Sequence, residues 1–350
     1  MELIHTFMNV VAQPIMLTSL LLFLPPFYFF KLFYSSLASF FPEDMTHKVV
    51  LITGASSGIG EYLAYEYAKR GAFLVLVARR ERSLHEVAER ARELGSPDVV
   101  VVPADVAKHD ECRIFVDVAI TNFGRLDHLV NNAGIESLCL FEEVNDITNF
   151  RAMMDVNFWG SVYPTHFAIP HLKKTGGRIV GITSIAGYNF IPRMSFYSAS
   201  KGALLNFYET IRVELGREVG VTIVVPGVIE SEMSKGKVFS REGRMKVDQD
   251  LRDVVLSTVP VERTEDCAKA IVKGACRGAW YVIEPPWFIS LYFFRVFMPE
   301  IVGWSMRLLY MTLPGVPAAT SALTKKLLDL SALKDLLYPS SIQSPEIKAG

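Results

Sequence analysis

Short apolar runs alternate with longer amphipathic segments through most of the chain, from Lys48 to about Glu284. The runs are continuously apolar rather than alternating, which is typical of strands covered on both faces. Helical patterns lie between them, for example from Gly58 to Arg70 and from Arg82 to Leu94. The predicted strands are Val49–Thr53, Phe73–Val77, Val99–Val102, Leu126–Val130, Arg178–Thr183, Val221–Val225 and Trp280–Ile283. This alternation predicts an α/β fold with a doubly wound parallel sheet of about seven strands.

The N-terminal segment is the most apolar part of the chain, with no charged side chain from Thr6 to Phe30. About 20 such residues suffice to span a bilayer. A cleaved signal fits poorly, because no Lys or Arg precedes the stretch and no small-residue cleavage pattern follows it. Pro25 and Pro26 interrupt it, so we expect a kinked span or a hairpin within residues 1–45.

The few charges beside this segment predict its orientation. Lys31 and Lys48 flank its C-terminal side, whereas Glu2 is the only charge before it. Positive charge favours the cytosolic side, so the domain at residues 46–285 is expected to face the cytosol from the membrane.

Two segments outside the strand–helix alternation are candidates for contact with a substrate. The polar stretch between Ser231 and Pro260 could form a lid over the carboxyl ends of the strands, or a solvated loop. A second apolar region, 288–311, is interrupted by charges and prolines and carries interfacial aromatic residues. It predicts an interfacial helix or, equally, a homodimer interface or core packing. Residues 286–350 therefore form a C-terminal extension, which is expected to end in a loose tail from Pro339.

Composition narrows the function. The chain has 350 residues, of which 50% are hydrophobic, and its net charge is −1, with no basic stripe suited to nucleic acid. The four cysteines, Cys112, Cys139, Cys267 and Cys276, have no paired spacing. We therefore expect reduced thiols and no metal site.

A glycine-rich turn follows the first predicted strand and opens the first helix of this domain. Glycines at such a turn let the backbone approach a pyrophosphate, whose charge the helix N-terminus stabilises. The expected cofactor-binding residues here are Gly54, Ser56, Ser57, Gly58, Ile59 and Gly60. The turn makes the predicted domain a Rossmann-type dinucleotide-binding fold.

The end of the second strand predicts which dinucleotide binds. The chain reads Ala78-Arg79-Arg80 there, without the carboxylate that would accept a ribose hydroxyl. Guanidinium groups match a 2′-phosphate, so we expect NADP(H), with Arg79 as a contact. The alternative is a pair of solvated arginines that lead the next helix.

Tyr197 and Lys201 are four residues apart and share one face of a predicted helix. A nearby ammonium favours the phenolate, so we expect a lowered tyrosine pKa and a role in proton transfer.

These motifs together resemble the short-chain dehydrogenase/reductase superfamily over about 240 residues. The matching positions, beyond the glycine turn and the Tyr197/Lys201 pair, are Asp105-Val106, Asn131-Asn132-Ala133-Gly134, Asn157, Ser184 and Pro226-Gly227. The resemblance implies that Tyr197 is the general acid/base, that Lys201 tunes it and holds the nicotinamide ribose, and that Ser184 binds the reacting oxygen. It further implies that Asn157 anchors a water, and that Asp105, Asn132, Ala133, Gly134, Pro226 and Ser231 line the cofactor cleft.

A closer resemblance is to plant steroleosins, oil-body dehydrogenases related to 11β-hydroxysteroid dehydrogenase. It rests on the apolar N-terminus, Arg79-Arg80, 157–160 (Asn-Phe-Trp-Gly) and 192–195 (Pro-Arg-Met-Ser). It implies an NADP-linked alcohol/ketone interconversion of a sterol at a lipid droplet or the endoplasmic reticulum membrane. The alternatives are a reductase of another lipid carbonyl, or a lipid-droplet structural protein that retains the fold.

Overall fold

The computed structural model describes residues 1–38, 40–311, 322–329, 333–344 of the chain. It divides into two compact units, Met1–Glu43 and Asp44–Gly350, which we describe separately.

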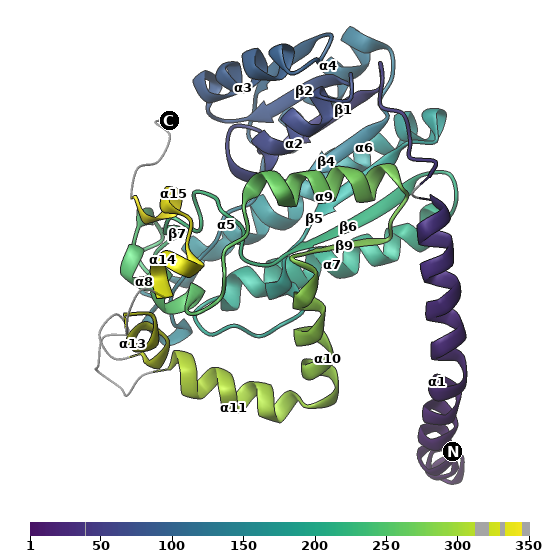
Figure 1. Ribbon diagram of the computed structural model, residues 1–350, viewed down its shortest axis with the longest axis vertical. Helices are drawn as coiled ribbons and strands as arrows, with labels where there is room; N and C mark the ends of the chain where they lie inside the picture. Colours follow the sequence, from purple (N-terminus) through teal and green to yellow (C-terminus); the bar gives the residue numbers. More distant parts are fainter. Residues whose placement is uncertain (39, 312–321, 330–332, 345–350) are drawn as a thin grey trace. The chain divides into compact units, whose positions relative to one another are not determined.

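The larger unit is built on the predicted parallel sheet, with seven strands in the order β3-β2-β1-β4-β5-β6-β9 (Figure 1). The strands are β1 (Val49–Thr53), β2 (Phe73–Ala78), β3 (Val99–Pro103), β4 (His128–Asn131), β5 (Arg178–Ile182), β6 (Gly220–Pro226) and β9 (Tyr281–Glu284). All neighbouring pairs are parallel, and β1 is buried at every residue. The predicted fold class is therefore confirmed.

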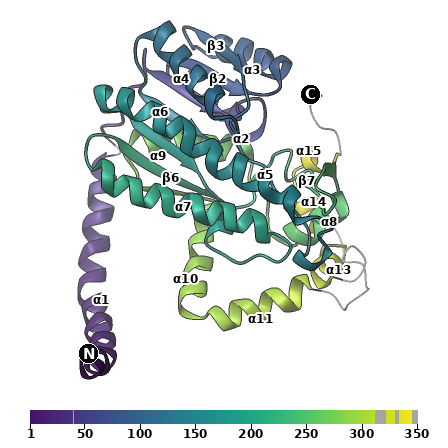
Figure 2. The same ribbon diagram turned by 180° about the vertical axis from the view of Figure 1, so that it is seen from behind.

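Six long helices cover the two faces of the sheet, because successive strand side chains point to opposite sides. Val50 and Ile52 pack with α2 (Gly58–Ala68), α3 (Glu81–Glu93) and α9 (Thr264–Cys276). Val49 and Leu51 pack with α4 (His109–Phe123), α6 (Gly160–Thr175) and α7 (Ser195–Leu215). Figure 1 looks onto the first of these faces and Figure 2 onto the second. The four cysteines are buried free thiols.

The chain order reverses between β1 and β4, which lie side by side at the middle of the sheet. A crevice forms at the carboxyl ends of the strands at such a switch point. Hydrogen bonds hold the two loops together there, since the backbone amides of Asn132 and Ala133 donate to Thr53 Oγ1 at 3.0 and 3.2 Å. The Asn132 side-chain amide donates in turn to the carbonyls of Thr53 and Gly54.

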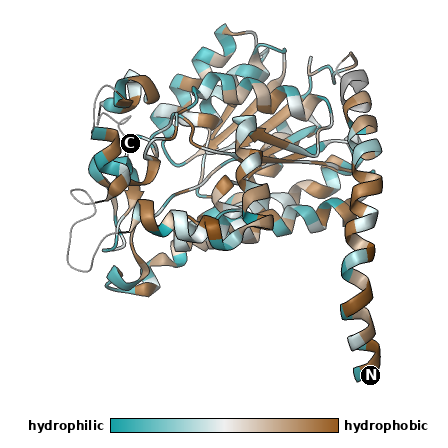
Figure 3. Cartoon of the chain, turned by 60° about the horizontal axis from the view of Figure 1, so that its bottom comes forward, coloured by the Kyte–Doolittle hydropathy of each residue, from teal (hydrophilic) through white to brown (hydrophobic). Residues whose placement is uncertain are grey.

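The smaller unit contains one helix, α1 (Glu2–Ala38), which runs through Pro14, Pro25 and Pro26. The segment is one continuous helix, so it does not form the hairpin that the sequence left open. Over Glu2–Phe33 it is long and apolar enough to cross a membrane, and none of its most apolar window is buried. Figure 3 shows hydrophobic residues along its length, as in the strands of the sheet.

The polar segment after β6 is folded rather than an open loop. It contains a hairpin of β7 (Lys237–Phe239) and β8 (Met245–Val247), followed by α8 (Gln249–Leu256). The strand β9 leads through a 3-10 turn, η5 (Pro286–Phe288), into α10 (Ile289–Phe297) and α11 (Pro299–Tyr310).

The C-terminal part packs on α8 through α13 (Leu323–Asp329), α14 (Leu333–Leu337) and α15 (Ser340–Gln343). Tyr338 and Ile342 are buried, so the predicted loose tail is wrong for 339–344, because apolar side chains there pack against Val261. Residues 345–350 lie outside the described part.

A buried carboxylate ties these C-terminal helices to α8. Asp253 accepts hydrogen bonds from Arg252 at 2.6 and 2.9 Å, from Lys325 at 3.0 Å and from Lys334 at 2.7 Å. Arg252 also donates to the Ile342 carbonyl at 2.6 Å. Burial alone would raise the pKa of Asp253, but Lys334, Lys325 and Arg252 together hold this pKa below its usual value.

We expect Asp253→Ala to destabilise the protein by roughly 3–5 kcal/mol, because it leaves the buried Arg252 guanidinium without its counter-charge. Thermal unfolding at pH 7 measures this loss, and Asp117→Ala, at an exposed aspartate of α4, is the control. The carboxylate stabilises the fold above its unfolded pKa and loses this effect as pH falls. The difference between wild type and Asp253→Ala should therefore shrink below about pH 4. A constant difference down to pH 3 would contradict this account.

Candidate active site

The glycine turn closes tightly between β1 and α2. Gly54 and Gly58 have φ angles of 66° and 58°, which favour glycine. A Cβ on Gly60 would lie 2.3 Å from the Gly54 carbonyl oxygen, so that position requires glycine for packing. Ser56, Ser57, Ile59 and the first two glycines line a cleft, while Gly60 supports the turn from behind.

The far side of the cleft comes from loops after β3, β4 and β6. Asp105, Asn132, Ala133, Gly134, Pro226 and Ser231 all line it, as the sequence predicts. Asp105 Oδ1 accepts from the Ala107 amide at 3.1 Å, which orients this carboxylate within its own loop. A Cβ added to Gly58 would lie 3.4 Å from the Cβ of Ser231, so the two loops approach each other closely. These residues form a groove that suits a dinucleotide.

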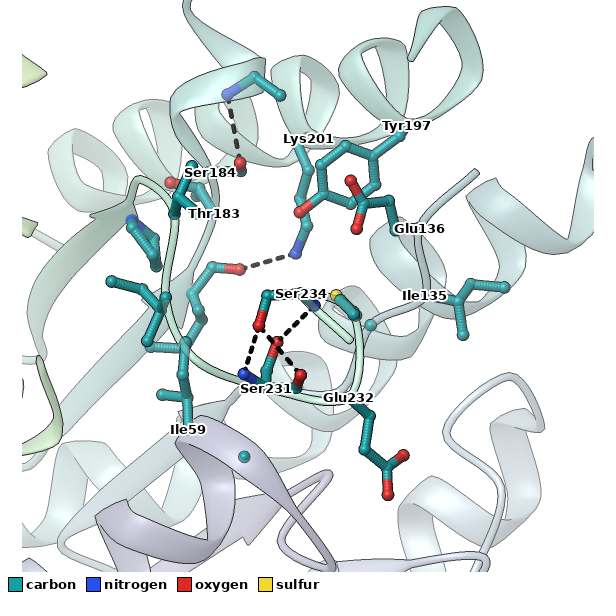
Figure 4. A pocket seen from close by; sticks show the side chains of 18 of the residues that line it. Ile59, Ile135, Glu136, Thr183, Ser184, Tyr197, Lys201, Ser231, Glu232 and Ser234 are labelled. Carbon is teal, nitrogen blue, oxygen red and sulfur yellow. Dashed lines mark hydrogen bonds between the residues drawn. The ribbon is translucent and has the colours of Figure 1, made fainter. Parts of the chain in front are cut away.

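Tyr197 and Lys201 lie one turn apart on α7 and both face the cleft (Figure 4). Lys201 Nζ donates to the Ile182 carbonyl at 3.0 Å and lies 5.9 Å from the centre of the Tyr197 ring. Ser184 follows β5, where its Oγ accepts from the Ala186 amide at 3.2 Å. The side chains of Tyr197, Ser184 and Lys201 all line the same cleft, so the two hydroxyls are available to one substrate oxygen.

Asn157 lies behind these residues, in a π-helical turn, η3 (Asp155–Trp159), and is completely buried. Its Oδ1 accepts from the Ile135 amide at 2.8 Å. Its Nδ2 donates to the Ile135 carbonyl and to Ser200 Oγ, both at 2.9 Å. The side chain thus clamps the loop after β4 onto α7, while its relation to a water stays a prediction. A π-turn is a frequent device for placing such a group.

Burial dominates the electrostatics of the pair. It lowers the pKa of Lys201 to about 8, against the opposing charge of Glu136. It raises the pKa of Tyr197 above its usual value, as does the charge of Glu136, while the Ser184 hydroxyl acts the other way. The lowered tyrosine pKa expected from the sequence is therefore not found in this arrangement, because removal of the phenol from water and the charge of Glu136 both raise this pKa.

Two arginines line the outer end of the cleft: Arg79, which the sequence predicts as a cofactor contact, and its neighbour Arg80. Arg80 donates to Ser57 Oγ at 2.6 Å and to Ser56 Oγ at 3.2 Å. It also forms an ion pair with Glu232 at 2.7 Å. The Arg79 side chain is exposed and lines the same end.

Beyond Tyr197 the cleft continues into an apolar chamber, in a cavity of about 410 Å³. Its walls come from the loop before α7, from α8 and from the C-terminal helices; they include Ile191, Met194, Val255, Val259, Phe288, Leu291, Val302, Met306 and Tyr310. The segment 231–260 therefore borders the cavity, as a lid would. This volume is within the usual range of small-molecule sites, about 300–1,000 Å³.

Sequence patterns missed several lining residues. Glu136 and Asn189 lie in loops without a motif, and the C-terminal helices reach the chamber only through the tertiary fold. The one available signal was Glu136 itself, an isolated charge in the apolar run from Ile135 to Leu140.

Comparison with known proteins agrees with this geometry. The family model described as short chain dehydrogenase matches residues 48–241. The chain is 57% identical over 348 residues to "11-beta-hydroxysteroid dehydrogenase A" of Sesamum indicum, covering 99% of both chains. It is 55% identical over 349 residues to "11-beta-hydroxysteroid dehydrogenase 1A" of Arabidopsis thaliana, covering 100% of both.

Two solved structures have the same fold. A short chain dehydrogenase/reductase from Burkholderia phymatum in complex with NAD aligns with a TM-score of 0.66 at 24% identity, over 74% of this chain and 96% of the other. An alcohol dehydrogenase from Thermococcus sibiricus, complexed with 5-hydroxy-NADP, aligns with a TM-score of 0.56 at 25% identity, over 68% and 95%.

Proposed function

The chain belongs to the short-chain dehydrogenase family of oxidoreductases, and from this we propose that it is a membrane-anchored, NADP(H)-dependent hydroxysteroid dehydrogenase. One observation carries the proposal: Tyr197, Ser184 and Lys201 line the same cavity, at the place where a dinucleotide groove opens into an apolar chamber. The names of the plant relatives support a steroid in that chamber. The reaction interconverts a secondary alcohol and a ketone.

The proposed chemistry assigns one task to each residue. When bound in the groove, the nicotinamide cofactor supplies or accepts a hydride. Tyr197 delivers a proton to the substrate oxygen in reduction and takes it back in oxidation. Ser184 donates a hydrogen bond to the same oxygen, which stabilises its developing negative charge. Lys201 stabilises the phenolate electrostatically and, by our proposal, holds the nicotinamide ribose.

Asn157 positions other residues and does not touch the substrate in this proposal. It fixes the spacing between α7 and the loop after β4, which leaves room for the cofactor beside Gly134. A Cβ on Gly134 would lie only 3.4 Å from Lys201 Nζ and 3.3 Å from Asn157 Oδ1. The residues of the groove thus fit a nicotinamide dinucleotide, with glycine where space is smallest.

We expect Tyr197→Phe to lower kcat for steroid turnover by roughly 10²- to 10⁴-fold, since it removes the proton donor. Binding of NADPH, measured by fluorescence titration, should stay within a few-fold of wild type. Tyr65→Phe, which alters a tyrosine of α2 outside the cavity, is the matched control. Turnover at the wild-type rate in Tyr197→Phe would rule out this mechanism.

The preference for NADP(H) rests on the groups around Arg80. The end of β2 offers no carboxylate, and the Arg80 guanidinium lies against both serines of the glycine turn. A 2′-phosphate there would replace Glu232 as its partner. Glu232 would remain paired, because Lys237 Nζ also lies 2.7 Å from its carboxylate.

We expect Arg80→Ala to raise KM for NADPH by roughly 10- to 100-fold, because the 2′-phosphate then loses a charged hydrogen-bond donor. KM for NADH should change little. Arg82→Ala, which removes an exposed arginine from the start of α3, is the control. Equal effects of Arg80→Ala on both cofactors would show that this residue does not read the 2′-phosphate.

Membrane attachment is proposed from two separate surfaces. The exposed apolar helix α1 is long enough to span a bilayer. In the larger unit, one side of α11 (Val302, Met306, Tyr310) lines the chamber, whereas Ile301, Trp304 and Leu308 are 57, 66 and 52% exposed. An interfacial helix with these two faces would let an apolar substrate enter from lipid. We assign the enzyme to the lipid droplet or endoplasmic reticulum, with its catalytic domain in the cytosol.

Replacing the outer face of α11 by charge tests this second surface. The variant Ile301→Glu/Trp304→Glu should lower kcat/KM for a steroid dissolved in phosphatidylcholine vesicles about tenfold, since charge opposes insertion into the interface. Activity on a water-soluble ketosteroid should be unchanged. Val213→Glu, at an exposed apolar residue of α7, is the control. Equal loss on both substrates would instead indicate damage to the chamber.

A further inference from the structure

Glu136 faces the catalytic cavity, yet the proposed proton transfer has no use for it. Figure 4 shows its carboxyl group beside the ring of Tyr197, on the loop that follows β4. Within the described residues, the Glu136 carboxylate has no hydrogen bond, and only the more distant charge of Lys201 acts on it. A carboxyl group is therefore presented to the substrate space without a hydrogen bond from the described residues.

The backbone around Glu136 is held on both sides, so this placement is built into the fold. The preceding residue, Ile135, uses both its amide and its carbonyl with the Asn157 side chain. The Glu136 carbonyl itself accepts from the Phe239 amide of β7 at 2.7 Å. The Leu138 amide donates to the Phe239 carbonyl at 3.3 Å. These bonds fix the backbone of the loop at Glu136.

Glu136 lies inside the cavity and keeps partial exposure there. Its removal from bulk water raises the pKa of Glu136 to about 7, against the favourable charge of Lys201. We therefore expect ionisation of this carboxyl group to oppose folding and an apolar residue to be tolerated. Polar groups that destabilise a fold at its cavity are candidates for ligand contact.

A second unsatisfied group lines the same cavity. Both Oδ1 and Nδ2 of Asn189 are buried without a hydrogen-bond partner among the described residues. Buried polar atoms are normally paired, so these two atoms also call for a partner that enters the cavity. The remaining walls of the chamber are mainly apolar. The chamber therefore offers two polar contacts beyond the hydroxyls of Tyr197 and Ser184.

We propose that Glu136 determines specificity by accepting a hydrogen bond from a second hydroxyl group of the substrate, on a carbon adjacent to the reacting one. This deepens the proposed function and rests on it. Tyr197 and Ser184 already take the reacting oxygen, and Glu136 lies beside Tyr197, so its partner is a neighbouring group. The preferred substrates are then steroid-sized α-hydroxyketones and vicinal diols, with Asn189 as a further polar contact.

The proposal also explains why a glutamate here is useful despite its cost. An apolar wall distinguishes a hydroxylated from a non-hydroxylated substrate only weakly. A site built to bind a hydroxyl rejects the analogue that lacks it far more strongly, because its own polar group is then left unpaired.

The test compares two ketosteroids that differ only in a hydroxyl on the carbon next to the ketone. With NADPH and the full-length protein, wild type should favour the hydroxyketone in kcat/KM by roughly 10- to 100-fold. Glu136→Leu should abolish this preference, because the hydroxyketone loses its acceptor and the parent ketone no longer faces an unpaired carboxylate; kcat/KM should therefore fall for the first substrate and rise for the second. Glu136→Gln, which keeps an acceptor oxygen, should retain part of it. Glu142→Gln, at an exposed glutamate nearby, should retain all of it.

Thermal unfolding separates specificity from folding. Both Glu136 variants should be at least as stable as wild type, and their advantage should be larger at pH 8 than at pH 5. The reason is that the pKa of Glu136 is higher in the folded than in the unfolded protein. The carboxyl group therefore destabilises the fold above its unfolded pKa, and this destabilisation grows as the pH rises to about 7.

Three results would overturn the proposal. Wild type could reduce both ketones equally well, or Glu136→Leu could slow both by the same factor, which would indicate only an electrostatic effect on Tyr197. These two results leave the dehydrogenase function intact. If wild type neither turns over nor binds any steroid of the pair, the proposed function fails and the specificity role of Glu136 fails with it.

Discussion

The buried ammonium of Lys201 is the interaction on which the rest of the site depends. It lies at the carboxyl end of β5, donates to the Ile182 carbonyl, and is almost fully removed from water. The Ile182 carbonyl and the charge of Glu136 both favour an ammonium in this position, against the cost of its burial. Burial lowers the pKa of Lys201 to about 8. The lysine therefore remains mostly protonated at neutral pH, as a partner of Tyr197 should be.

The parallel sheet makes this arrangement possible. Its strands deliver their carboxyl ends to one edge, and the switch between β1 and β4 opens a crevice there. Hydrogen bonds between Thr53 and Asn132 close the base of the crevice. Asn157 clamps the adjoining loop to α7. The site is thus supported by backbone contacts from three separate elements, which leaves the reactive side chains free to face the cavity.

The two ends of the cavity have opposite chemistry. The groove near the glycine turn is polar and carries the arginines, whereas the chamber beyond Tyr197 is bounded by apolar residues of α8, α10 and α11. The reacting groups lie at the boundary between them. A polar nucleotide and an apolar substrate can therefore meet at Tyr197 while each stays in an environment that suits it. Glu136 and Asn189 are exceptions to this division, which is why they point to a polar feature on the substrate.

The sequence by itself determined the sheet, the glycine turn and the placement of Tyr197 and Lys201 on one helix face. These follow from local patterns: continuous apolar runs, glycines between strand and helix, and a tyrosine and a lysine one turn apart. Apart from Arg79, the other residues expected in the dinucleotide groove came from the family resemblance. The exposed apolar helix at the N-terminus was predicted in the same way, although the sequence left a hairpin open. Only the tertiary structure decided the pKa direction of Tyr197, the role of Arg80 beside Ser56 and Ser57, and the packing of 339–344. Only it brought Glu136, Asn189 and the C-terminal helices to one chamber. Burial and contacts between residues far apart in the chain set these features, and neither is encoded in a short motif.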